Sequence, residues 1–160
     1  FYYEGDQLIE TNVLGPGIIL NQNSGQNSVR GFEITLNAHP LDHLHAFLSY
    51  SYMDSDKDLP FSPNKFNYWV NYSIRKIEAT LYGEVVDHLW SSYQLNQLPP
   101  RSTIERMPDY GLIHLKMHYL LTDKLRIGLG LENLLDEDYS IMKGYPMPGR
   151  NYNMHFSFEF

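Results

Sequence analysis

The sequence contains no cysteine, which excludes a disulfide framework and any metal site built on thiolates. It has no run of about 18 apolar residues, so a transmembrane helix is excluded. Lys and Arg number 12 against 19 Asp and Glu, and the net charge of −7 argues against a nucleic-acid surface. The mean hydropathy of −0.40 leaves one membrane class open, the β-barrel, because its strands are half polar.

Aromatic residues are plentiful, with 13 Tyr and 8 Phe, and many of them stand at every second position. The C-terminal stretch shows this most clearly, since polar residues separate its alternate large side chains. Such alternation is typical of a β-strand with one apolar and one polar face. The sequence predicts about seven amphipathic strands of roughly membrane-spanning length, about 9–11 residues, and no helix. They lie at residues 31–40, 44–52, 65–74, 77–85, 111–119, 125–132 and 152–160.

The connections between these strands alternate in length. Short ones (HPLDH, RK and LTD) are separated by long ones that hold most of the Pro and Asn residues. An outer-membrane barrel has this asymmetry, with tight periplasmic turns and long outer loops. A soluble antiparallel sandwich has strands that alternate in the same way, but it gives no reason for one-sided loops. We therefore expect a barrel wall whose last strand descends to the periplasm and places Phe160 at the inner rim.

Aromatic side chains should then form two bands, because amphipathic rings are favoured at both membrane–water interfaces. The outer band is predicted at the strand ends beside the long loops, and the inner band beside the short turns. The outer set is Tyr50, Tyr52, Phe66, Tyr68 and Tyr152, and the inner set is Tyr72, Tyr119, Phe158 and Phe160.

Two stretches carry a family resemblance. Residues 128–160 contain Asn-Leu-Leu-Asp-x-x-Tyr, then Tyr-Pro-x-Pro-Gly-Arg, then a strand that closes on Phe; residues 28–56 contain a Gly-Phe-Glu strand, a Pro-Leu turn and a Ser-Tyr-x-Asp strand. This order resembles the C-terminal part of TonB-dependent outer-membrane receptors, and the Pro-x-Pro-Gly-Arg form is similar to that of the cobalamin, siderophore and haem branches. The matching residues of the first stretch are Asn133, Leu134, Leu135, Asp136, Tyr139, Tyr145, Pro146, Pro148, Gly149 and Arg150.

The resemblance implies an all-β, antiparallel transmembrane β-barrel segment of seven to eight strands within a barrel of about 22 strands. Residues 1–160 would be the C-terminal portion, with the plug domain, its TonB-contacting segment and the earlier strands lying outside this chain. The opening FYY reads as the end of a strand, and no signal peptide is visible. The terminal strand would be the signal read by the barrel-assembly machinery, carried by Tyr152, Met154, Phe156, Phe158 and Phe160. It would also pair with the first strand to seal the sheet.

By the same resemblance, the function is TonB-dependent active uptake of a scarce nutrient: a ferric siderophore or cobalamin, with haem a weaker fit. Expected partners are outer-membrane lipid, the remaining strands and plug, TonB through that plug, the assembly machinery, and an iron chelate or corrinoid. Aromatic faces and fixed donors suit such ligands. Tyr145 and Arg150 could instead brace the loop above the last strand. The candidate ligand-binding residues are Tyr93, Gln94, Arg101, Arg106, Tyr139, Lys143, Tyr145 and Arg150.

Other functions fit the residues less well. A structural barrel subunit without transport is the main alternative. An outer-membrane enzyme would need a catalytic set, and the spacing of Ser51, His45 and Glu33 does not form one. No metal site or cofactor is predicted: His114 and His118 are about 13 Å apart on one strand. His39, His43 and His45 merely flank a turn. Gly128 and Gly130 should leave the lumen face flat, so that a plug packs against them.

Overall fold

The computed structural model describes residues 1–5, 9–15, 18–23, 27–55, 61–95 and 101–159. All regular structure in these residues is β-strand. No helix within the described ranges is long and apolar enough to cross a membrane.

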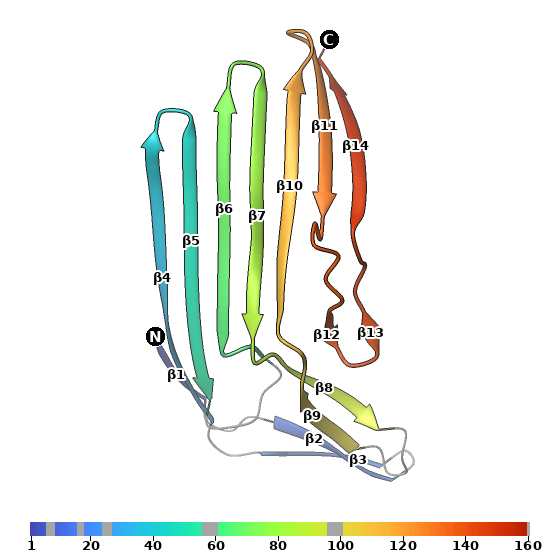
Figure 1. Ribbon diagram of the computed structural model, residues 1–160. Helices are drawn as coiled ribbons and strands as arrows, with labels where there is room; N and C mark the ends of the chain where they lie inside the picture. The colour runs from blue at the N-terminus through green and yellow to red at the C-terminus, as the bar shows by residue number, and fades with distance from the viewer. Residues whose placement is uncertain (6–8, 16–17, 24–26, 56–60, 96–100, 160) are drawn as a thin grey trace.

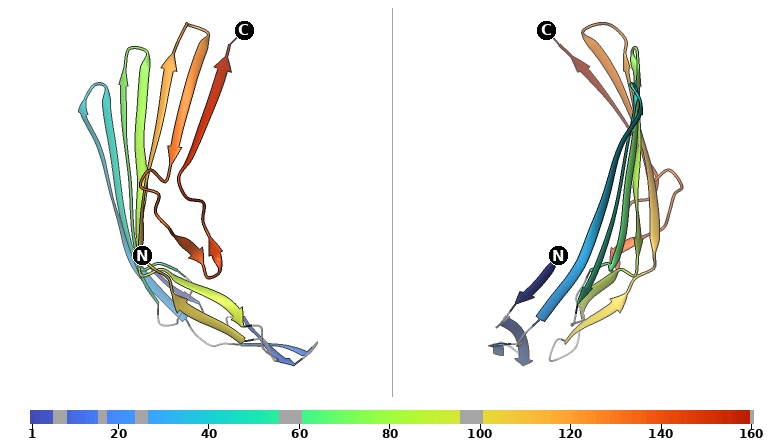
Figure 2. Two further views of the ribbon diagram at one scale, coloured as in Figure 1. Left: turned by 45° about the vertical axis from the view of Figure 1, so that its right-hand side comes forward. Right: turned by 90° about the vertical axis from the view of Figure 1, so that its left-hand side faces the viewer.

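Eight long strands form one antiparallel sheet, and nearly every strand pairs with its neighbours in chain order (Figure 1). The predicted seven to eight strands are therefore confirmed. Figure 2 shows the sheet as a single twisted, curved layer with open edges at its first and last strands. The order is β1 (Tyr2–Gly5), β4 (Asn27–Leu41), β5 (Leu44–Ser55), β6 (Asn64–Ile74), β7 (Ile77–Asp87), β10 (Tyr110–Leu120), β11 (Leu125–Glu132) and β14 (Asn151–Phe158).

The long connections contain three further hairpins, and all lie at the end of the sheet opposite the short turns (Figure 1). The one-sided loop arrangement expected from the sequence is thus present, but its strand content was not predicted. The hairpins are β2 (Ile9–Gly15) with β3 (Ile18–Asn23), β8 (Trp90–Leu95) with β9 (Arg101–Arg106), and β12 (Ser140–Met142) with β13 (Tyr145–Pro146).

One face of the sheet is apolar and exposed. The strand registers align the alternate apolar residues of neighbouring strands, as in the pairs of Leu129 with Met154 and of Ile127 with Phe156. The exposed fractions of Leu48, Leu129 and Phe156 are 37%, 43% and 65%, which no closed protein core would allow. No second layer covers this face in the described part of the chain (Figure 2). The fold is therefore a wall with a lipid-facing side, as expected, and the sandwich alternative is wrong.

The opposite face is polar and its side chains bond to one another across strands. Ser49, which is 4% exposed, donates a hydrogen bond to Glu33 on β4 at 3.1 Å. Lys65 and Glu84 form an ion pair at 2.6 Å between β6 and β7. Aromatic rings also lie on this face: Phe47 stacks on Trp69 with a centroid distance of 6.1 Å. This polar face is the lumen face of the wall.

Gly128 and Gly130 have a different role from the one expected. Both lie on the lumen face of β11, but the space above them is filled by side chains of the adjacent strand β14. A Cβ at Gly128 would overlap the ring of His155, and one at Gly130 would overlap the amide of Asn153. The expectation that these glycines keep the face flat for a plug was wrong, because β14 itself occupies the space.

The C-terminal strand forms an edge of the sheet. β14 pairs with β11, while β1 lies at the far edge beside β4, so the first and last strands of this chain do not pair within the described residues. Tyr152, Met154, Phe156 and Phe158 all face outward and are at least half exposed. Phe160, the fifth residue of the predicted assembly signal, lies outside the described residues. Phe158 pairs with Leu125, so the strand ends beside the short turns.

Candidate functional site

The loop end of the wall carries most of the candidate binding residues. One buried side chain fixes the conformation of the loop between β11 and β14. Asn133 follows β11 and is 3% exposed. Its Oδ1 accepts a hydrogen bond from the Glu137 backbone at 2.8 Å, and its Nδ2 donates to the Glu137 carbonyl at 2.9 Å and the Pro148 carbonyl at 3.4 Å. Its own N–H donates to Nδ1 of His114 at 3.1 Å. Asn133 therefore ties the beginning of the loop to its end.

A second brace joins the two halves of the C-terminal signature. The backbone N–H of Arg150 donates to Oδ1 of Asp136 at 2.7 Å. Asp136 has φ of 58°, a left-handed conformation that Asp and Asn tolerate better than most residues. The backbone of Arg150 is thus structural, while its side chain is exposed. Tyr145, the first residue of β13, is 66% exposed and remains available to a ligand.

Tyr139 packs against the inner surface of the loop end. Its ring lies 4.8 Å from that of Tyr110, beside a small buried cluster of Val86, Tyr110 and Leu112. Partial burial, with the nearby carboxylates of Glu84 and Glu132, raises the pKa of Tyr139 above its ordinary value. The phenol therefore stays protonated at neutral pH. In this position it anchors the loop to the wall.

Two of the predicted cationic residues are already paired. Lys143, between β12 and β13, contacts the carboxylate of Glu105 on β9 and so links two hairpins. Arg106 bonds both carboxylate oxygens of Asp109, at 3.2 and 3.0 Å, and lies 3.8 Å from Asp87. A ligand that used either cation would have to compete with these carboxylates.

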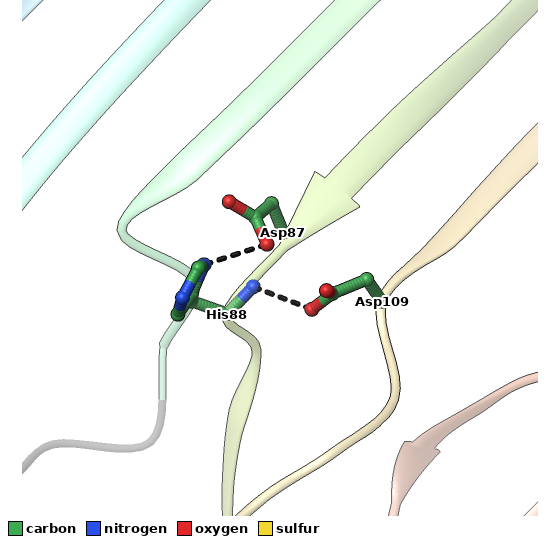
Figure 3. Close-up of side chains that lie close together, drawn as sticks. All are labelled: Asp87, His88 and Asp109. Carbon is green, nitrogen blue, oxygen red and sulfur yellow. Dashed lines mark hydrogen bonds and ion pairs between the residues drawn. The ribbon is translucent and has the colours of Figure 1, made fainter.

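Asp87, His88 and Asp109 form the cluster of potential metal ligands drawn in Figure 3. Nδ1 of His88 lies 2.6 Å from Asp87, and the His88 backbone N–H donates to Asp109 at 2.9 Å. That backbone bond, together with Arg106, lowers the pKa of the Asp109 carboxyl below its ordinary value. The guanidinium already neutralises the carboxylates, so the cluster fits a structural staple between β7, β9 and β10 better than a cation site.

A cleft of 360 Å³ opens between the segment that precedes β10 and the β12–β13 loop. Tyr139 is the one candidate ligand-binding residue among those that line it, because nothing in a single sequence shows which loops meet. Its lining is Met107, Pro108, Asp138, Tyr139, Ser140, Pro146 and Met147.

The remaining predicted residues lie on the β8–β9 hairpin. The backbone register pairs Tyr93 with Thr103, and Leu95 with Arg101. The side chains of Tyr93, Gln94 and Arg101 lie outside what the structure describes. Their role in binding therefore stays a prediction.

An open antiparallel wall with one lipid-facing side, long loops at one end and tight turns at the other defines a segment of an outer-membrane β-barrel. The family model for the β-barrel of TonB-dependent receptor-like proteins matches residues 1–134. The chain belongs to this family.

Solved receptors share the fold at low sequence identity. The pyoverdine outer membrane receptor FpvA from Pseudomonas aeruginosa PAO1 matches with a TM-score of 0.78 and 18% identity, over 99% of this chain and 26% of the receptor. The siderophore receptor PirA from Acinetobacter baumannii matches with a TM-score of 0.74 and 17% identity, over 99% of this chain and 28% of the receptor. The closed form of the ferric-catecholate import receptor Fiu from E. coli K12 matches with a TM-score of 0.72 and 16% identity, over 99% of this chain and 24% of the receptor. The chain therefore spans about a quarter of the length of these receptors.

Proposed function

We propose that residues 1–160 form the C-terminal part of the wall of a TonB-dependent receptor that imports an iron chelate, with a ferric siderophore as the substrate class. The observation that carries the proposal is the two-faced sheet in a chain of this receptor family. Such a wall needs the other strands and a plug domain, because an open sheet edge in lipid leaves backbone groups unsatisfied. The energy would reach the receptor through TonB and the plug.

The orientation follows from the loops. The short turns and the end of β14 lie at one end of the sheet, and the hairpins lie at the other (Figure 1). We place the turns and the C-terminus in the periplasm and the hairpins outside the cell, as in other outer-membrane barrels. The terminal strand would then be presented to the barrel-assembly machinery by its exposed face of Tyr152, Met154, Phe156 and Phe158.

The substrate class is supported by the loop end. Ferric siderophores are often anionic and planar in part, so they suit an exposed phenol and guanidinium beside a cleft. Tyr145 and Arg150 provide these groups, and the cleft beneath the β12–β13 loop is large enough for part of such a ligand. Cobalamin is the second candidate, since its corrin ring would use the same aromatic contact.

Uptake in a deletion strain tests the proposal. The strain should lose growth on limiting iron with one ferric siderophore, and regain it when the complete gene is restored. Growth on limiting cobalamin should be unchanged. Uptake of radiolabelled iron should also disappear when TonB is deleted. Loss of growth on cobalamin alone would reassign the substrate. Copurification with complementary strands but no uptake of either compound would instead favour the structural barrel subunit.

A further inference from the structure

Two histidines lie together on the lumen face, although they stand on strands that are not neighbours. The rings of His118 on β10 and His155 on β14 are 5.1 Å apart between centroids, with 68° between their planes. The strand registers explain how they meet: His118 pairs with Gly128 on β11, and Gly128 pairs with His155. The two histidines therefore occupy one row of the sheet, with a glycine between them.

Gly128 makes the contact possible. A Cβ at this position would overlap the Cε1 and Nε2 atoms of His155, so any other residue would displace the ring. The missing side chain lets His155 lie across β11 and reach His118. The next row repeats the arrangement with Asn153 above Gly130, but there the reaching side chain is an amide.

The surroundings of the pair favour a ligand. Nδ1 of His118 is buried and has no hydrogen-bond partner among the described residues, and such an orphaned group is costly unless something binds it. A pocket of 140 Å³ lies beside His118 and is also lined by Glu78 and Arg126. Glu78 is the register partner of His118 on β7, so a carboxylate stands next in the same row.

We infer that His118 and His155 bind a divalent transition metal ion of the Cu²⁺, Ni²⁺ or Zn²⁺ type on the lumen face, near the turn end of the wall. Neutral imidazole is a preferred ligand of these ions, whereas Ca²⁺ and Mg²⁺ require oxygen ligands. Water, or Glu78 after a side-chain rotation, would complete the coordination. Arg126 opposes the charge of the ion, so the site should be weaker than a closed structural metal site. The inference rests on the sheet alone and is independent of the imported substrate.

A second histidine pair must be removed before the test. The rings of His39 and His45 are 4.2 Å apart at the β4–β5 turn, and both residues are exposed. Neither has a buried unpaired nitrogen among the described atoms, and no glycine opens a path between them. All proteins in the test therefore carry His39→Gln and His45→Gln, so that copper bound there cannot contribute.

The experiment uses the protein extracted from outer membranes in detergent, complete with its other strands and without a polyhistidine tag. Cu²⁺ is titrated, and electron paramagnetic resonance counts the coordinating nitrogens. We expect one ion with two imidazole nitrogens. His118→Gln or His155→Gln should each remove one nitrogen and weaken binding by more than the roughly 10- to 100-fold that loss of a second-shell partner costs. Arg126→Gln should strengthen binding.

Gly128→Ala is the discriminating variant, because it keeps both histidines but displaces one ring. It should abolish the two-nitrogen signal, whereas Gly130→Ala, which creates a smaller overlap of the same kind one row away, should retain it. Equal signals in the two glycine variants, or no copper binding before mutation, would overturn the inference. If Gly128→Ala does not assemble, a second measurement tests the site. Bound Zn²⁺ should protect His118 and His155 from modification by diethyl pyrocarbonate. Unchanged modification of both rings would then refute the site.

Discussion

Asn133 and Glu137 exchange hydrogen bonds in both directions: the Glu137 N–H donates to the Asn133 side chain at 2.8 Å, and that side chain donates to the Glu137 carbonyl at 2.9 Å. One buried amide thus reinforces the backbone turn in which the Asp136 N–H donates to the Asn133 carbonyl at 2.9 Å. Asn133 also has φ of 52°, a conformation that Asn tolerates better than most residues. The loop that carries the candidate ligand residues depends on this contact.

Replacing Asn133 by Ala should destabilise the protein by about 3 kcal/mol, because buried backbone groups lose their partners and Ala is strained at positive φ. Asn133→Gly should destabilise the protein by about 1 kcal/mol less than Asn133→Ala does, because glycine relieves the strain at positive φ but does not restore the lost hydrogen bonds. Urea unfolding of the protein refolded into lipid vesicles measures both values. Equal stabilities for the two variants would show that the backbone conformation carries no cost.

The two faces of β14 should respond differently to charge. Met154 faces outward and is 61% exposed, whereas the adjacent Asn153 lies on the lumen face. Met154→Arg should cost about 2–4 kcal/mol, as expected for a cation near the bilayer midplane, and Asn153→Arg should cost much less. Folding into vesicles, followed by heat-dependent gel mobility, reports the difference. A larger penalty at Asn153 would reverse the assignment of the faces.

The strands could be predicted from the sequence because each strand is recognised by its own alternation of apolar and polar residues. Leu48, Leu129 and Phe156 lie on the exposed, lipid-facing side, as predicted. Contacts between strands could not be predicted. Gly128 was interpreted from its own strand, but its role depends on His155, 27 positions later in the chain, through a register that no local pattern reveals. The loop hairpins were missed because their sequences lack alternation. Asn133 was recognised as part of a signature, but its buried hydrogen bonds were not visible.

The Lys65–Glu84 ion pair should contribute little. The side chains are 42% and 26% exposed, so water and salt screen the 2.6 Å contact. A double-mutant cycle with Lys65→Met and Glu84→Gln should give a coupling below about 1 kcal/mol, and less at high salt. Measuring the cycle at two salt concentrations checks this. A large coupling that salt does not change would mean that the pair is shielded from water in the complete barrel.

Acid should loosen the staple at Asp109. Its pKa is lowered by the His88 backbone N–H and by Arg106, so the carboxylate form is favoured in the folded protein. The stabilisation is therefore complete above the ordinary Asp pKa of about 3.9 and is lost as the pH falls through the lower folded value. Limited proteolysis between β9 and β10 should increase only in that acidic range. Asp109→Asn should show the increased cleavage at every pH, and an unchanged pattern in this variant would contradict the staple.

Tyr145 and Arg150 should contribute to ligand affinity without supporting the wall. The Tyr145 side chain is 66% exposed, and the loop is braced through the backbone of Arg150 rather than its guanidinium. Arg150→Ala should therefore keep the Asp136 contact and the barrel intact, while weakening an anionic iron chelate by up to about tenfold, or about 1.4 kcal/mol. Tyr145→Ala should have a similar effect. Lys143→Ala is the matched control, because Lys143 already contacts Glu105. Fluorescence quenching by the chelate measures all three, and a loss confined to Lys143→Ala would move the binding surface to the β8–β9 hairpin.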